Sequence, residues 1–67
     1  MPDISSEIAQ IDQRIAAVRE DLRGLIERAA ASHGAADEER TSQRIADQQE
    51  LLDTLTKQRA ELIQTNT

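Results

Sequence analysis

Cysteine and all three aromatic residue types are absent from this 67-residue sequence, which has one proline and two glycines. Without cysteine the chain forms no disulfide and has no thiolate chemistry. Without Phe, Trp and Tyr its core must consist of aliphatic side chains, each contributing about 1.5–3 kcal/mol when fully buried. Ordering such a chain costs about 1.5 kcal/mol per residue, so a small domain without cross-links usually needs very regular helix packing or an oligomer.

Basic side chains are outnumbered, with 8 Lys and Arg against 13 Asp and Glu, for a net charge of −5. They do not cluster, so the long-range field should repel nucleic acid and anionic membranes. No apolar run approaches the roughly 20 residues that span a bilayer. The N-terminus also lacks the basic and apolar regions of a signal peptide. We therefore expect a cytoplasmic protein with neither a membrane nor a nucleic-acid partner.

The first half of the sequence has a strict heptad repeat of apolar residues. Its members alternate steps of four and three: Ile4, Ile8, Ile11, Ile15, Val18, Leu22, Leu25 and Ala29. With Ile8 at position a, this seam predicts a helix over about residues 3–33. Gly24 falls at position c, outside the seam, where it costs about 1 kcal/mol relative to alanine without breaking the pattern.

A weaker apolar seam in the second half predicts a second helix over about residues 37–65. Its members are Thr41, Ile45, Gln48, Leu52, Leu55, Arg59 and Leu62. Between the halves, Gly34 suits a left-handed C-terminal cap and Asp37 suits an N-cap. We expect a turn at about 33–36, and hence a single all-α domain of residues 1–67, an antiparallel helical hairpin.

A single continuous helix is the rival interpretation, and the phase of the repeat argues against it. The first heptad would continue through Ala36 and Gln43, whereas the seam resumes at Ile45, two residues late. Coiled coils commonly absorb insertions of three or four residues, so a reversal of chain direction is the simpler explanation.

A chain that folds back about Ala35 pairs residues of the two helices whose numbers sum to about 70. Ile8 then meets Leu62, Ile15 meets Leu55, Val18 meets Leu52 and Leu25 meets Ile45, with mixed layers of Ile11 with Arg59, Leu22 with Gln48, and Ala29 with Thr41.

Position g of the first helix reads Glu7, Arg14, Asp21 and Arg28, alternating in sign at each heptad. Within the hairpin these groups lack complements, because Arg14 would face Gln58, Asp21 would face Leu51 and Arg28 would face Arg44. A simpler interpretation is that these four charges only keep one flank of the helix solvated. An antiparallel copy of the same helix complements all four, because Glu7 meets the copy's Arg28 and Arg14 meets its Asp21. This pattern predicts a homodimeric antiparallel four-helix bundle, in which each apolar seam is buried against another copy. The expected interface contains Glu7, Ile11, Arg14, Ile15, Val18, Asp21, Leu22, Arg28, Leu51 and Leu55.

The position e flank should then face the second helix of the same chain. There Ser5, Asp12, Arg19 and Ile26 are expected to meet Ile63, Thr56, Gln49 and Ser42.

Other candidate sites are weaker. His33, the only histidine, suits the C-terminal end of a helix dipole. The nearby acidic residues match no ligand spacing, so we expect no metal site and no cofactor. Small side chains form an outer stripe that could dock a protein partner, although alanine's helix propensity explains most of it. The predicted docking face contains Ala9, Ala16, Ala17, Arg23, Gly24 and Ala31.

The sequence bears on three classes of function. A non-catalytic interaction or scaffolding module that binds itself and another protein fits every feature. The alternative is a regulatory RNA-binding hairpin, because the chain resembles plasmid RNA-modulator proteins in architecture, although the first helix presents Gln13, Glu20 and Glu27 outward. Residues 8–15 also resemble the first helix of helical chorismate mutases, but no basic residue precedes Arg14 and a third helix is lacking. With no nucleophile, paired acid or phosphate loop elsewhere, we expect no enzyme activity and no catalytic residues.

Overall fold

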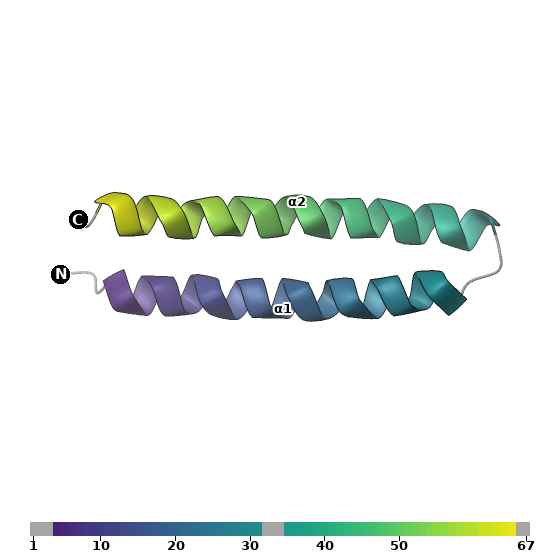
Figure 1. Ribbon diagram of the computed structural model, residues 1–67, viewed down its shortest axis with the longest axis horizontal. Helices are drawn as coiled ribbons and strands as arrows, with labels where there is room; N and C mark the ends of the chain where they lie inside the picture. The colour runs from purple at the N-terminus through teal and green to yellow at the C-terminus, as the bar shows by residue number, and fades with distance from the viewer. Residues whose placement is uncertain (1–3, 32–34, 66–67) are drawn as a thin grey trace.

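The chain folds into two antiparallel helices lying side by side, α1 from Ile4–Ala31 and α2 from Ala35–Thr65 (Figure 1). This computed structural model describes residues 4–31 and 35–65, and the side chains of α2 from residue 38 onward. The Cα atoms span 51 × 14 × 14 Å, so the molecule is a rod two helices wide. The predicted all-α hairpin is confirmed. Gly34 and His33, around which the turn was predicted, lie outside the described residues.

Helix α1 keeps its apolar side chains on one stripe, as the heptad repeat requires. Its first turn contains Glu7 and its last turn contains Arg28, charges that suit the positive and negative ends of the helix dipole. Gly24 lies inside the helix, and a Cβ atom added there would meet nothing within 4 Å.

Helix α2 begins at Ala35, two residues before the predicted start at 37. Asp37, which was predicted as the N-cap, therefore lies inside the helix, two residues after its start. Three threonine hydroxyls donate hydrogen bonds to backbone carbonyls four residues earlier, those of Thr54 to Glu50 at 3.0 Å, Thr56 to Leu52 at 2.8 Å and Thr65 to Glu61 at 3.0 Å. These bonds satisfy the hydroxyls without breaking the helix.

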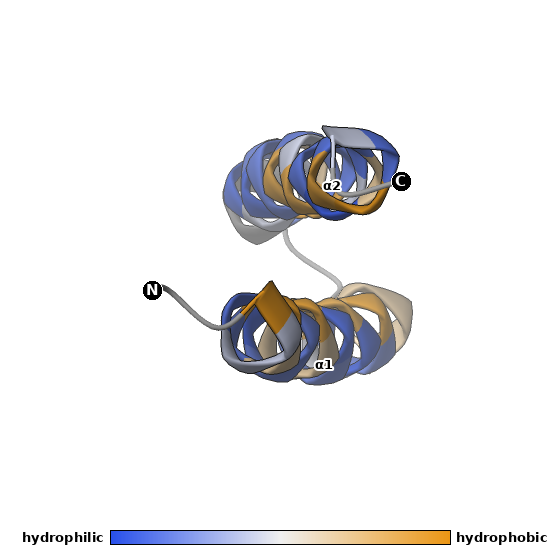
Figure 2. Ribbon diagram, turned by 90° about the vertical axis from the view of Figure 1, so that its left-hand side faces the viewer, coloured by the Kyte–Doolittle hydropathy of each residue, from blue (hydrophilic) through white to orange (hydrophobic). Residues whose placement is uncertain are grey.

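The apolar stripes of both helices face each other, which Figure 2 shows from the open end of the hairpin. The central cluster consists of Ile15, Val18, Leu22 and Leu55, with Ile11, Ile45 and Leu52 packed against it. Leu25 is also buried. Thr41 is the single buried polar residue among the side chains that the structure describes. The pairs predicted as Ile15 with Leu55 and Val18 with Leu52 thus belong to one core.

Two contacts between the helices measure the register. The Arg59 guanidinium donates to Asp12 at 2.7 Å, and the Gln48 amide donates to Asp21 at 3.3 Å. The residue numbers of these pairs sum to one above and one below the predicted 70. The register predicted from the two seams is therefore confirmed.

The second helix already covers the middle of the seam. Five apolar residues, Ile15, Val18, Leu22, Leu25 and Leu55, are only 5–8% exposed in a single hairpin. The prediction that the seam needs another copy for its burial is too strong for these residues, because two regular helices shield them. Within the described ranges, neither helix has a stretch apolar enough to cross a bilayer.

Candidate protein-interaction faces

Four charged residues of α1 lie along one side of the groove between the helices, and we call this side the charged face. Its α1 members are Glu7, Arg14, Asp21 and Arg28, all exposed. Glu7 and Arg14 border a hollow that Gln58 of α2 also lines, whereas Asp21 and Arg28 border a second one with Arg44. The sequence-derived neighbours Arg14 with Gln58 and Arg28 with Arg44 are thus found together.

The contact of Asp21 differs from the prediction, which placed this residue opposite Leu51 with no polar or charged partner on the second helix. Its carboxylate accepts the hydrogen bond from Gln48, because the long amide side chain reaches outward from the seam. For the other three members, Glu7, Arg14 and Arg28, the described part of the chain offers no ion-pair partner within 4 Å. Arg28 and Arg44 instead border the same hollow with like charge.

Leu51 places an apolar side chain in the middle of the charged face. Its exposed fraction is 43%. Along α2 it lies one heptad after Arg44 and one heptad before Gln58. The other apolar members of the predicted interface lie deeper, since Ile15, Val18, Leu22 and Leu55 are buried by the partner helix of their own chain and Ile11 is half-buried. Leu51 and the charged side chains are therefore the most accessible members of the predicted interface in a single hairpin.

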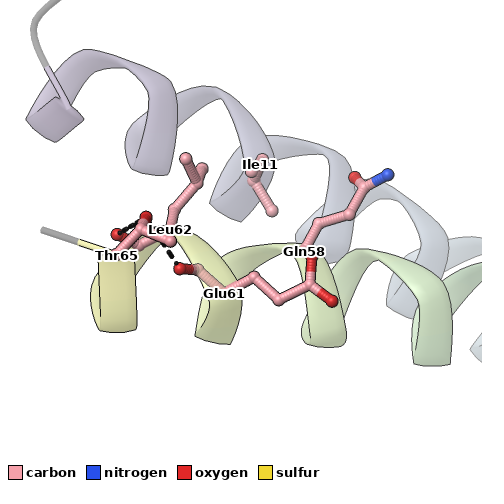
Figure 3. Close-up of a pocket in the computed structure, with 5 residues that line it drawn as sticks. All are labelled: Ile11, Gln58, Glu61, Leu62 and Thr65. Atoms are coloured by element: carbon pink, nitrogen blue, oxygen red, sulfur yellow. Dashed lines mark hydrogen bonds between the residues drawn. The ribbon is translucent and has the colours of Figure 1, made fainter.

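The open end of the charged face contains a hollow of about 380 Å³ between the two helices. Figure 3 shows Ile11 of α1 and Leu62 of α2 converging on it, while the carboxylate of Glu61 extends along the outside of α2. The Thr65 hydroxyl turns back to the Glu61 and Leu62 carbonyls, at 3.0 and 3.2 Å. Ile11 and Leu62 give the hollow an apolar floor, and Gln58, Glu61 and Thr65 border it with polar side chains.

The opposite flank carries the strongest contact that the sequence did not predict. Asp12 was expected to meet Thr56 but pairs with Arg59, whose predicted seam neighbour is Ile11. The arginine keeps its aliphatic stem at the seam and turns its guanidinium out to the carboxylate. Heptad position fixes the height of a residue but not how far its side chain reaches, so the sequence could not show this pair.

The predicted docking stripe divides between two surfaces. Its members Ala9, Ala16, Ala17, Arg23, Gly24 and Ala31 are all exposed. However, Gly24 borders the hollow of Arg28 and Arg44, on the charged face, whereas Arg23 borders another hollow with Ile26. A single docking face across the whole stripe therefore does not describe the structure.

The hollow around Ile26 forms a second candidate face, which we call the Ile26 hollow. It measures about 340 Å³ and is lined by Arg19, Leu22, Arg23, Ile26 and Glu27. Ile26 is 54% exposed, the largest value for a large apolar side chain in the described ranges. The prediction placed Ile26 against Ser42, and this exposure shows that α2 leaves most of the side chain open.

Among the side chains that the structure describes, no three of His, Cys, Asp or Glu come together. His33, which the sequence places at the C-terminal end of the first helix, lies outside the described residues. Comparisons with protein-family models, with curated proteins and with solved structures find no match for this chain.

Proposed function

We propose that the chain is a non-catalytic protein-interaction module that acts as a homodimer through its charged face. One observation carries the proposal: Glu7, Arg14, Asp21 and Arg28 alternate in sign along an exposed face whose hairpin supplies no opposite charge within ion-pair distance, over the described residues. An ordinary solvated flank would not require such regular alternation.

A second copy running antiparallel complements the whole pattern in one register. Glu7 then meets Arg28 of the copy, and Arg14 meets its Asp21. Asp21 can accept this bond while retaining Gln48, because a carboxylate has several lone pairs. Each exposed pair contributes only about 0.2–1 kcal/mol, so the charges select the partner and its register more than they stabilise the dimer.

The dimer would leave the Ile26 hollow of each copy free for another protein. Arg19 and Arg23 outnumber Glu27 around Leu22 and Ile26, which fits an acidic amphipathic helix that inserts one large aliphatic side chain. The module would thus present two equivalent docking sites, as an adaptor or scaffold does.

Sedimentation equilibrium tests the homodimer directly. We expect about twice the 7.5 kDa chain mass at micromolar concentration. Arg14→Glu should weaken association, because it places like charges opposite each other twice per dimer, and Arg14→Glu with Asp21→Arg should restore it. Arg19→Glu makes the same change of net charge on the opposite flank and should leave the association unchanged.

A wild-type chain that stays monomeric while fully helical would refute the dimer. If Arg19→Glu weakened association as much as Arg14→Glu, net charge and not the charged face would be responsible. A double variant no better than Arg14→Glu alone would exclude the proposed register.

A further inference from the structure

Helix α2 extends the charged face and gives it opposite charges at its two ends. Near the turn, Arg44 borders the same hollow as Arg28 of α1. Near the open end, Glu61 borders the hollow of Ile11 and Gln58, which joins the hollow that Glu7 borders. Arg28 and Arg44 therefore lie together toward the turn, beyond Asp21, and Glu7 and Glu61 lie toward the open end, beyond Arg14.

We infer that Arg44 pairs with Glu61 of the second copy, so that α2 supplies half of a face-to-face twofold interface. This inference rests on the proposed homodimer and specifies its geometry. An antiparallel copy lays the Arg28 and Arg44 end over the Glu7 and Glu61 end, and does so twice. A parallel copy would oppose like charges at both ends.

The register of the hairpin makes this inference quantitative. The α1 pairs place the twofold axis at a height between Ala17 and Val18. The contacts from Asp12 to Arg59 and from Asp21 to Gln48 show which residues of α1 and α2 lie at the same height. By this register, the axis passes α2 between about Leu52 and Asp53. An antiparallel copy then matches α2 residues whose numbers sum to about 105.

The numbers of Arg44 and Glu61 add up to this sum. The position of the axis was set by the charges of α1 alone, so the match on α2 is independent of it. Neither residue forms an ion pair within the described part of its own hairpin. Leu51 lies within two residues of the axis, so the two copies of this exposed side chain would be only about 5 Å apart along the helices. The interface would have a leucine pair at its centre and arginine–glutamate pairs toward both ends.

This arrangement differs from a bundle in which the hairpins open to share their seams. Here α2 stays on the seam of its own α1, and the copy lies against the charged face. The central core residues therefore remain as buried in the monomer as in the dimer.

Charge reversal on α2 tests the pairing. Arg44→Glu should raise the dimer dissociation constant about 2- to 30-fold, since it removes two exposed pairs. The swap of Arg44→Glu with Glu61→Arg should return it to near the wild-type value. Glu50→Arg and Lys57→Glu make matched charge changes away from this face and should have little effect. Far-UV circular dichroism at matched concentration checks that every variant remains helical.

The outcomes separate this inference from the proposed function. If Arg14→Glu weakens the dimer and Arg44→Glu does not, the dimer stands and the α2 pairing is wrong. If Arg44→Glu weakens it but the swap does not restore it, Arg44 meets a group other than Glu61. A monomeric wild type would overturn both proposals.

A distance measurement tests the orientation independently of charge. A spin label at Glu27→Cys should be separated from its counterpart by about 30 Å along the antiparallel dimer, whereas a parallel dimer would put both labels at one height. Double electron–electron resonance distinguishes these cases. A short distance that accompanies a confirmed dimer would overturn the antiparallel pairing.

Discussion

The isoleucines of α1 show how strongly one substitution should depend on position. Ile15 is 7% exposed in the central cluster, whereas Ile26, in the same helix, is 54% exposed. Ile15→Ala should lower the free energy of unfolding by about 2–4 kcal/mol, because it leaves a cavity between the helices. Ile26→Ala should cost less than about 1 kcal/mol, because the side chain is already largely hydrated. Urea unfolding followed by circular dichroism measures both.

Equal losses for the two variants would contradict this burial pattern. They would mean that Ile26 is covered in solution, by another copy or by a rearranged hairpin.

At the residue scale, the sequence predicted which side chains share a layer but not all the polar contacts between layers. The hydrophobic repeat places Ile15 opposite Leu55, and the structure puts both in one cluster. The Asp12–Arg59 and Asp21–Gln48 contacts were not predicted, because a heptad position does not show how far an arginine or glutamine side chain reaches sideways from the seam. Because their polar groups turn outward, Arg59 and Gln48 occupy mixed layers without burying those groups, whereas Thr41 is buried in its layer.

The two helices differ in how firmly their sequences specify them. Helix α1 has an unbroken apolar stripe, whereas α2 places Thr41, Gln48 and Arg59 in its seam. The seam of α1 predicted its helix clearly. The start of α2 was predicted two residues late, because alanines such as Ala35 and Ala36 are equally compatible with a turn and with a helix. Capping preferences alone could not decide between them.

Gly24 is the weakest point in α1. Replacing it with alanine should raise the free energy of unfolding by up to about 1 kcal/mol, because alanine restricts the unfolded chain and its Cβ meets nothing within 4 Å. Ala16→Gly, at another exposed position of α1, is the matched control and should lower it by a similar amount. Thermal unfolding at low protein concentration provides the measurement.

A destabilised Gly24→Ala variant would conflict with the open space around this residue. If the loss appeared only at high concentration, a second copy would approach the backbone of α1 at Gly24, which borders the charged face.

At the scale of the whole molecule, charge separates protein interaction from the alternative of RNA binding. The net charge is −5, and Glu7 and Asp21 interrupt the arginines of the charged face. We expect no retention of single-stranded or hairpin RNA on filters at low salt, because phosphate binding needs continuous positive potential. Salt-sensitive retention that Arg14→Glu and Arg44→Glu abolish would instead support the RNA-binding alternative.

The hairpin has its two open helix ends, Ile4 and Thr65, at the same end of a rod 51 Å long (Figure 1). In the proposed antiparallel dimer, the corresponding ends of the two copies would point in opposite directions. A cargo fused next to Ile4 or Thr65 would then be held roughly 40 Å from its counterpart along the dimer, by a strut with two attachment points at each tip. Such a dimer would work as a molecular spacer as well as a connector.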